Sequence, residues 1–361
     1  MSVKVRPVHS GSWEVDIHAV FPDGTRRRER KRILLSSKSS ALRWGQERER
    51  LLLAGRLTRM KREEVPTVEA FGPRFLDGYA RANQHKPSGI SAKESILRVH
   101  LVPILGTTRL DAIRNEDVQM LKRRLVGKAP KTVNNILATL NRMLNVAVEW
   151  GVIESLPCTI KHLRVPRSTM AFHDFAEYQR LVKAASEIDG NTYLIVLLGG
   201  EAGLRCGEMM ALAGSDVDFK RECLVVERSE WKGHVTVPKG GRGRRLRLTV
   251  RLQDALQQHR HLRSRRILCE RSGAPFTQKM VRSRVRWAER RAGLRPKGVH
   301  ALRHTFCSHL AMHGAAAKAI QELAGHEDLS TTQRYMHFSP KAVESAIRLL
   351  DGPVPAWAVE N

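Results

Sequence analysis

Residues 300–305 read His300-Ala-Leu-Arg303-His304-Thr, and this stretch decides how the C-terminal half is expected to fold. His300 and Arg303 lie three residues apart at the predicted start of a helix, so their side chains share one face. An imidazole and a guanidinium on one face suit a phosphate. His304, four residues after His300, also allows a zinc site, but zinc hydrolases carry Glu where this sequence has Ala301.

A second stretch, Glu201-Ala-Gly-Leu-Arg205-Cys-Gly-Glu208, places another arginine at a turn into a helix. The planar guanidinium of arginine grips two phosphate oxygens and keeps its charge. Glu208 follows Arg205 by three residues and shares its helical face. The pattern fits a plain Arg–Glu helix pair or an arginine that binds phosphate and is held by the carboxylate.

A third stretch joins Leu323-Ala-Gly-His326 to Tyr335, one of four tyrosines in the chain. A lone tyrosine is usually a core aromatic with a satisfied hydroxyl. Here Ser330-Thr-Thr332 is predicted to cap a short helix that presents Tyr335. The alternative to a core aromatic is therefore a nucleophile held next to a histidine.

A fourth segment, Lys239-Gly-Gly-Arg-Gly243, is predicted to form the turn between strands at 234–237 and 244–248. A lysine at a glycine-rich tip is mobile. It fits an ordinary charged hairpin tip or a proton donor to a leaving oxygen. Lys232 is the other candidate for that role.

These segments together match what a side-chain nucleophile needs to cleave a phosphodiester. The needs are the nucleophile, positive charge on the non-bridging oxygens, a proton donor for the leaving oxygen and tight positioning. No metal-ligand set or cofactor fingerprint in the sequence competes for the same residues. We therefore expect neither a catalytic metal nor a cofactor.

The order and spacing of the segments resemble the tyrosine recombinases, or phage integrases. The Arg205 segment is similar to the family's first arginine box, His300-Ala-Leu-Arg303-His-Thr-Phe to its second, and Leu-Ala-Gly-His326 with Tyr335 to its third. The resemblance covers about residues 170–350. The family's hairpin often reads Thr-Lys, whereas Lys239 follows Val-Pro here.

The resemblance implies how these residues act on the scissile phosphate. Tyr335 attacks it and forms a 3′-phosphotyrosyl bond. Arg205 and Arg303 stabilise the phosphorane-like transition state. His326 hydrogen-bonds the same phosphate.

The resemblance also implies the proton transfers. Lys239 protonates the leaving 5′ hydroxyl, and His300 helps to move the tyrosine proton. Glu208 fixes the loop that holds Arg205. The covalent intermediate stores the bond energy, so ATP is not needed, and two sequential exchanges pass through a four-way junction.

The composition points to a nucleic-acid partner. The chain has 63 Lys and Arg against 36 Asp and Glu, a net charge of +27. Such a field attracts polyanions, and neutralised phosphates release counterions. A ribosome-like or membrane-surface role explains the charge but not the motifs. The five cysteines show no paired spacing, the N-terminus shows no signal peptide, and the longest apolar run is too short for a bilayer, so we expect a cytoplasmic, nucleoid-associated protein.

The expected fold is α+β and multidomain, with a mainly helical catalytic domain that carries a small antiparallel sheet. Residues 1–62 are predicted to form an arm-type DNA-binding domain of three strands and a helix, and residues 65–160 a helical core-binding domain. Residues 168–352 form the catalytic domain, and 353–361 a tail. The segment 156–166, with two prolines, is the predicted linker.

Basic residues outside the motifs are candidates for DNA contact or are simply solvated. A basic strand at 26–32 favours a sheet laid against a DNA groove. The predicted DNA-binding residues are Arg26, Arg27, Arg28, Arg30, Lys131, Arg242 and Arg244.

The predicted partners follow from the resemblance. They are double-stranded DNA with core and arm-type sites, a homotetramer on that DNA, and DNA-bending accessory proteins. An amphipathic segment at 342–350 fits a helix that docks on a neighbouring protomer or on its own domain. The competing functions are a type IB topoisomerase, which uses similar chemistry, and a DNA-binding protein without catalysis. The basic N-terminal sheet favours recombination, because a swivelling relaxase has no evident use for it.

Overall fold

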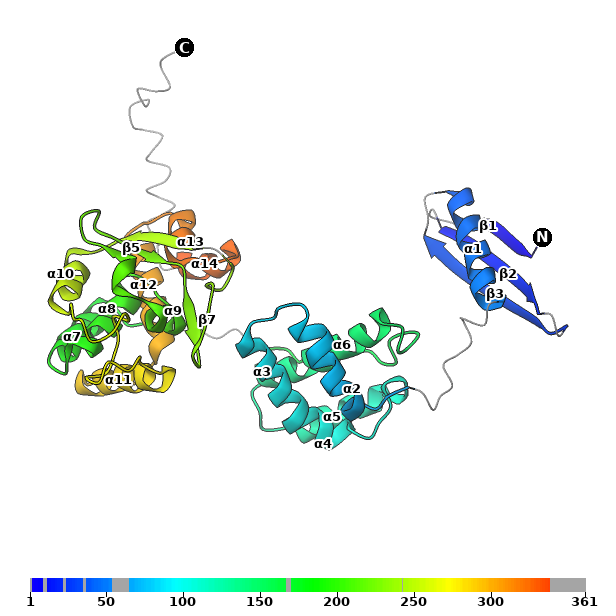
Figure 1. Ribbon diagram of the computed structural model, residues 1–361, viewed down its shortest axis with the longest axis horizontal. Coiled ribbons are helices and arrows are strands. Elements are labelled where there is room, and N and C mark those ends of the chain that lie inside the picture. Colours follow the sequence, from blue (N-terminus) through cyan, green and yellow to red (C-terminus); the bar gives the residue numbers. More distant parts are fainter. Residues whose placement is uncertain are drawn as a thin grey trace, which may run out of the picture. The chain divides into compact units, whose positions relative to one another are not determined.

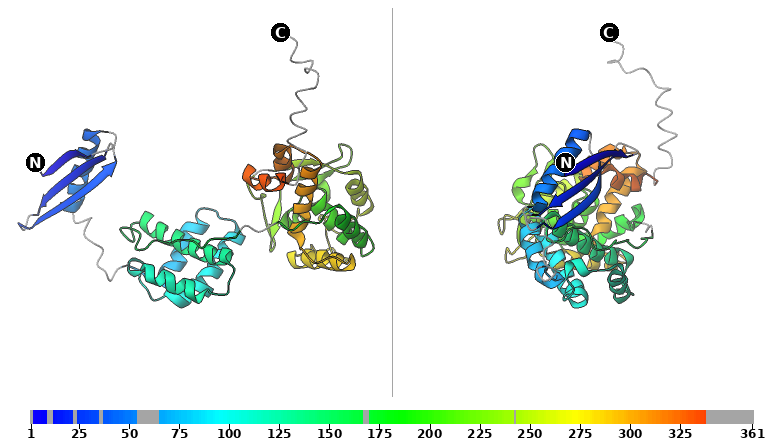
Figure 2. Two further views of the ribbon diagram at one scale, coloured as in Figure 1. Left: turned by 180° about the vertical axis from the view of Figure 1, so that it is seen from behind. Right: turned by 90° about the vertical axis from the view of Figure 1, so that its right-hand side faces the viewer.

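The computed structural model describes residues 2–8, 12–21, 24–34, 37–53, 65–166, 170–241 and 243–337. These residues form an α+β chain of many helices and small antiparallel sheets, as Figures 1 and 2 show. The chain divides into two compact units, 1–84 with 92–164, and 85–91 with 165–361. Among the described residues no helix is long and apolar enough to cross a membrane.

The N-terminal residues form one antiparallel sheet covered on one face by a helix. The sheet has the order β1 (Val3–Val8), β2 (Ser12–Val20), β3 (Arg26–Leu34), and α1 (Lys38–Leu53) follows. Val15, Ile17 and Ala19 on β2 are buried with residues of α1, because alternate side chains of a strand point to the same face. The three predicted strands and the helix are confirmed (Figure 1).

Residues 65–153 build a separate helical core. Its elements are α2 (Val68–Arg74), η2 (Phe75–Arg81), α3 (Pro87–Ile96), η3 (Leu97–Leu101), α4 (Val102–Leu105), η4 (Leu110–Ala112), α5 (Asn115–Arg124) and α6 (Pro130–Glu149). Thr67 caps α2 by accepting a hydrogen bond from the Ala70 amide at 3.2 Å. At the start of α5, Asp117 accepts a hydrogen bond from the Arg114 amide at 2.8 Å. The segment 156–166 contains no helix or strand, and the predicted boundary at residue 62 lies outside the described residues.

The C-terminal part packs helices around small sheets. Its helices are α7 (Phe175–Ser186), α8 (Gly190–Gly200), α9 (Cys206–Ala211), η5 (Gly214–Asp216), α10 (Val250–Gln258), α11 (Gln278–Arg291), α12 (Val299–Met312), α13 (Ala317–Ala324) and α14 (Leu329–Met336). Its strands are β4 (Val217–Asp218), β5 (Cys223–Val226), β6 (Ser229–Trp231), β7 (His234–Thr236) and β8 (Arg244–Arg247).

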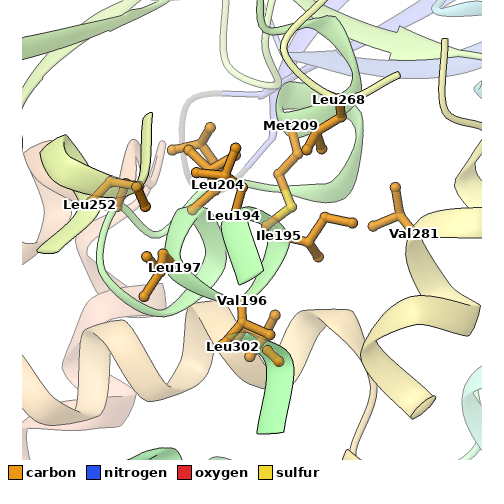
Figure 3. Packing of buried hydrophobic residues seen from close by; sticks show 14 of the residues in the cluster. Leu194, Ile195, Val196, Leu197, Leu204, Met209, Leu252, Leu268, Val281 and Leu302 are labelled. Carbon is orange, nitrogen blue, oxygen red and sulfur yellow. The ribbon is translucent and has the colours of Figure 1, made fainter. Parts of the chain in front are cut away.

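Helix α8 forms the centre of this part. Every residue from Leu194 to Gly200 is buried, and α7, α10, α11 and α12 all pack on α8. Figure 3 shows Leu252 of α10, Val281 of α11 and Leu302 of α12 around this helix. Leu302 of α12 and Met209 of α9 meet α8 at Gly199, where an added Cβ would lie 2.6 Å from Leu302 Cβ. This packing fixes α9 and α12, the two helices whose first turns carry the arginine motifs.

The strand pairing corrects one expectation about the segment 239–243. β7 pairs with β6 and β8 pairs with β5, so this segment connects two sheets and is not a hairpin turn. The actual hairpin turn joins β6 to β7 through Lys232 (φ 47°) and Gly233 (φ 82°). The sequence missed β6 because three residues are too short for an alternating pattern to be visible.

Candidate active site

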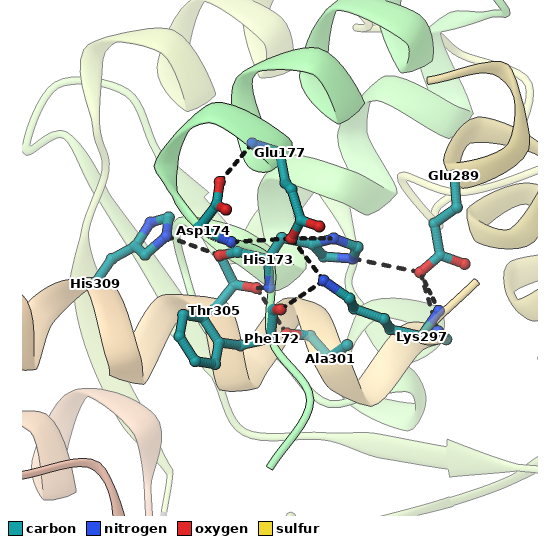
Figure 4. Close-up of polar contacts among 10 residues, drawn as sticks. Phe172, His173, Asp174, Glu177, Glu289, Lys297, Ala301, Thr305 and His309 are labelled. Carbon is teal, nitrogen blue, oxygen red and sulfur yellow. Dashed lines mark hydrogen bonds and ion pairs between the residues drawn. The ribbon is translucent and has the colours of Figure 1, made fainter. Parts of the chain in front are cut away.

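The N-terminal end of α12 is held by a buried polar network behind it (Figure 4). Glu289 accepts hydrogen bonds from the Lys297 and Gly298 amides, at 2.8 and 3.0 Å, just before α12 begins. His173 is fully buried and lies 3.3 Å from the Glu289 carboxylate. Thr305 Oγ1 accepts from the His173 amide at 2.9 Å, which joins the network to α12 itself. The first turn of α12 therefore has a fixed place.

Arg303 is the buried cation of the site. Its side chain is only 4% exposed, and Nη1 donates to the Gly203 carbonyl at 2.6 Å. Nη2 is buried and has no hydrogen-bond partner among the described residues. Burial and the neighbouring Arg205 lower the pKa of Arg303 to about 10, so it stays charged at neutral pH. A buried guanidinium with a free N–H is suited to an incoming anion.

Arg205 directly precedes α9 as its N-cap residue, which confirms the predicted turn into a helix, and its side chain reaches two partners. Nη1 donates to Glu208 at 2.8 Å, and Nη2 donates to the Gly325 carbonyl at 2.8 Å. Glu208 also accepts from Arg244 Nη2 at 2.7 Å. Burial raises the pKa of Glu208, but Arg244 and Arg205 outweigh burial and lower it to about 2. Glu208 is thus a buried carboxylate shared by two arginines.

Arg244 lies inside this network, not on an open surface. Its side chain is 8% exposed, and Nε donates to the Leu323 carbonyl at the end of α13 at 3.0 Å. We predicted Arg244 as a DNA-contacting residue. Its burial places the guanidinium against Glu208 and α13 instead, so it braces β8 against the segment that carries His326. The sequence could not show this, because the partners are 36 and 79 residues away.

His326 follows the left-handed Gly325 (φ 65°), which ends α13. Its Nδ1 is hydrogen-bonded to Thr332 Oγ1 at 2.9 Å. Thr332 therefore lies inside α14 and holds His326, whereas we predicted a capping role for it. Burial, Arg303 and Arg205 lower the pKa of His326 to about 3, so the imidazole is neutral at pH 7.

Tyr335 lies on α14 between two histidines. Its ring stacks on that of His326 with an interplanar angle of 2° and a centroid distance of 6.1 Å. Its hydroxyl is hydrogen-bonded to His304 Nδ1 at 2.7 Å. The residue is 1% exposed, and burial and Cys307 raise its pKa above the usual range. Among the predicted catalytic residues, Tyr335 is thus the most enclosed.

His300 lies one turn before His304 on the same helix face, with ring centroids 6.1 Å apart. Burial lowers its pKa, and the charges of Arg303 and Arg205 lower it further. Arg282 on α11 and Lys239 act in the same direction, so both lie within electrostatic range of His300. Nothing in the sequence marked Arg282, because it belongs to a helix with many arginines.

Lys239 lies close to the His326 segment. An added Cβ on its neighbour Gly240 would lie 3.8 Å from Glu327 Cβ, next to His326. Lys232 instead lies at the β6–β7 turn, with its Nζ 5.1 Å from the Trp231 ring centroid. It borders a cavity of about 670 Å³ lined also by Arg282 and Arg286. Of the two lysines, Lys239 is the one that acts on His300.

The predicted DNA-binding residues of β3 fall on two faces of the sheet. Arg26, Arg28 and Arg30 alternate on the face opposite α1, whereas Arg27 pairs with the buried Ala19 and so belongs to the α1 face. Arg28 Nε donates to Asp16 at 2.8 Å, and Arg30 also reaches that carboxylate. These side chains are exposed in spite of the pairing.

Of the remaining predicted residues, Lys131 is exposed at the start of α6. Arg242 lies outside the described residues, as do the segment 342–350 and the tail 353–361. No group of three or more His, Cys, Asp or Glu side chains within the described ranges is placed to hold a metal. His300 and His304, which suggested a zinc site, lie in the group around Tyr335 instead.

The site therefore brings Arg205, Arg303, His326 and Tyr335 together from four helices and their ends. Residues 172–342 match the model of the phage integrase family. The chain is 31% identical over 225 residues to tyrosine recombinase XerC of Thermodesulfovibrio yellowstonii, covering 60% of this chain and 74% of that protein. The chain belongs to the tyrosine recombinase family. It is an enzyme of site-specific DNA recombination.

Other relatives match more of the chain. The ICEBs1 integrase of Bacillus subtilis is 24% identical over 97% of this chain and 100% of its own length. Among solved structures, the Tn1549 transposon integrase in complex with transposon right end DNA has a TM-score of 0.65 at 20% identity, covering 78% of this chain and 99% of that one. A lambda integrase tetramer bound to a Holliday junction has a TM-score of 0.58 at 19% identity, covering 91% and 96%. These structures support the fold of this tyrosine recombinase.

Proposed function

We propose that this recombinase cuts and rejoins DNA through a 3′-phosphotyrosine on Tyr335 and thereby integrates or excises a mobile element. The observation that carries the proposal is the convergence of one tyrosine with two arginines that are far apart in sequence. Arg205 touches Gly325, and Arg303 touches Gly203, so the three motifs form one interlocked group. Full-length similarity to the ICEBs1 integrase supports the mobile-element context.

The cleavage step replaces one bond to phosphorus with another. The Tyr335 oxygen attacks the phosphorus, the bond to the 5′ oxygen breaks, and the 3′ phosphate stays on the enzyme. Arg205 and Arg303 neutralise the non-bridging oxygens as charge develops, which is the main electrostatic contribution to such a step. The buried Nη2 of Arg303 is the N–H that gains a partner.

One proton is transferred to the leaving 5′ oxygen, and another is removed from the attacking tyrosine. Lys239 donates a proton to the departing 5′ oxygen, and His300, which is kept neutral by its surroundings, accepts a proton from the tyrosine side. Neutral His326 donates a hydrogen bond to the phosphate through Nε2, because its Nδ1 is engaged with Thr332. Glu208 holds Arg205 in place.

Recombination requires attack by a 5′ hydroxyl from a second duplex, whereas the relaxation of supercoiled DNA by a topoisomerase rejoins the same strand. We propose that a homotetramer on double-stranded DNA supplies this arrangement, with the N-terminal sheet on arm-type sites and DNA-bending proteins as helpers. The lambda integrase tetramer on a Holliday junction is the relative that supports this assembly.

The proposal is tested by trapping the covalent intermediate. The chain is incubated in EDTA with a library of random nicked duplexes, and denaturation-resistant adducts are recovered and sequenced, which also selects a core site. We expect adducts without metal and none with Tyr335→Phe, which keeps the ring and lacks the nucleophile. Adducts that persist in Tyr335→Phe would overturn the assignment, as would a strict requirement for a divalent cation.

A further inference from the structure

The hydroxyl of Tyr335 is bound to helix α12. His304 Nδ1 lies 2.7 Å from the phenolic oxygen, within the range of a strong neutral hydrogen bond. Cys307, one turn further along α12, is fully buried and belongs to the same buried cluster as Tyr335. The nucleophile is therefore attached to the helix that carries Arg303, but through side chains with no assigned part in cleavage.

In this position the hydroxyl is closed to a phosphate. An attacking oxygen has to come within ~3–3.5 Å of the phosphorus. Tyr335 is only 1% exposed, so even a water molecule hardly reaches it, and a phosphodiester is larger. The described arrangement is thus one that precedes attack.

The charge state leads to the same conclusion. Burial, His300 and Arg303 lower the pKa of His304 to about 4, so its imidazole is neutral at pH 7. Burial raises the pKa of the Tyr335 phenol, and Cys307 raises it further. A neutral phenol between a neutral imidazole and a thiol is held as a hydrogen-bonding group and is not activated as a nucleophile.

We propose that His304 is a positioning residue that holds the Tyr335 hydroxyl in a resting place on α12, and that this contact breaks before attack on DNA. The expected effect of this contact on cleavage rests on the proposed role of Tyr335 as the nucleophile. The contact itself belongs to the free protein and is measured there. Once the contact with His304 is broken, the hydroxyl can reach a phosphate bound by Arg205 and Arg303.

Two amide substitutions of His304 distinguish the effect of losing the hydrogen bond from the effect of changing the size of the side chain. In His304→Asn the amide lies near the position of Nδ1 and keeps the bond to Tyr335. In His304→Gln the amide reaches the position of Nε2 and leaves that of Nδ1 empty. His309→Gln is the matched control, because His309 is a half-buried imidazole on the same helix whose Nε2 lies 3.0 Å from the His173 carbonyl.

Nitration by tetranitromethane measures the release in the free protein. The reagent attacks accessible phenolates, and mass spectrometry of the tryptic peptide 335–341 reads Tyr335 alone. We expect nitration to be about fivefold faster in His304→Gln, the population shift for one lost hydrogen bond, and near wild type in His304→Asn and His309→Gln. Equal rates in His304→Gln and wild type would overturn the proposal. So would an equal increase in His309→Gln, since this would reflect general loosening of α12.

Adduct formation on the selected nicked duplex measures the consequence. We expect His304→Gln to form the covalent adduct faster than wild type by about the same factor, with unchanged DNA affinity. Slower adduct formation that His304→Asn restores would show that His304 acts in cleavage itself, and would overturn the resting role. If no variant forms adducts while nitration still responds to His304→Gln, the proposed function fails and the contact stands.

Discussion

Glu208 shows at the scale of single residues how the site holds several cations close together. Its carboxylate accepts from Arg205 and Arg244, and both arginines also bind carbonyls at the end of α13. The sequence predicted Glu208 as the partner of Arg205, since the two lie three residues apart. The second arginine was not predictable, because only the tertiary fold brings β8 to α9.

We predict that Glu208→Gln loses more stability than a surface carboxylate does. Removing one partner of a buried ion pair costs ~3 kcal/mol or more in the free energy of unfolding, because the arginines stay buried. Chemical denaturation measures this. Glu187→Gln is the control: Glu187 pairs with Arg291 at 3.1 Å, but both side chains are about half exposed, and we expect ~0–1 kcal/mol. Similar losses for the two variants would contradict the bracing role.

The stability that Glu208 contributes depends on pH with a defined sign. Its folded pKa is lowered from 4.5 to about 2, so the contribution is complete above pH 4.5 and disappears as the pH falls toward 2. The difference in stability between wild type and Glu208→Gln should shrink in that window. A constant difference from pH 7 to pH 3 would show that the carboxylate charge is not the cause.

At the scale of elements, the connection from β7 to β8 differs most from its prediction. We expected Lys239 at a hairpin tip, yet that place belongs to Lys232, and Lys239 lies in a crossover near His326. Long helices such as α6 and the strands of the first sheet were predictable from periodicity. The strand β7 was predicted within 234–237, but its partner β6 was not, because three residues are too few for an alternating pattern to be visible.

The two lysines give a prediction with a chemical control. Lys239→Ala should slow cleavage ~10²-fold or more if Lys239 is the general acid, and Lys232→Ala should not. A substrate with sulfur in place of the leaving 5′ oxygen needs no proton donor, because a thiolate is a far better leaving group. Rates measured on both substrates should show Lys239→Ala near wild type on the sulfur substrate only. A defect on both substrates would make Lys239 a positioning residue.

The end of α13 gives a second prediction at this scale. Gly325 has φ 65°, and an added Cβ would lie 3.2 Å from Arg244. Gly314 has φ 82°, and no atom lies within 4 Å of an added Cβ. Alanine at either position should cost ~1 kcal/mol of backbone strain in thermal unfolding. Only Gly325→Ala should also slow adduct formation, because it displaces His326; equal cleavage by the two variants would contradict this.

At the scale of the whole molecule, the net positive charge and the N-terminal sheet together bear on how the chain binds DNA. The chain has a net charge of +27, and the first sheet adds exposed arginines on the face opposite α1. We predict that removal of residues 1–62 spares cleavage of the core site, impairs integration and reduces the salt dependence of DNA binding, since fewer phosphates are neutralised. Titrations of DNA binding at several salt concentrations measure the slope. Normal integration by the shortened chain would contradict an arm-type role.

The central claim is that Tyr335 carries the DNA strand during recombination, and one measurement addresses it directly. Adducts formed in EDTA are digested with nuclease and trypsin, and the peptides are sequenced by mass spectrometry. We predict a nucleotide joined through its 3′ phosphate to Tyr335, at the start of the tryptic peptide 335–341. A nucleotide on any other residue, or one joined through a 5′ phosphate, would contradict the account.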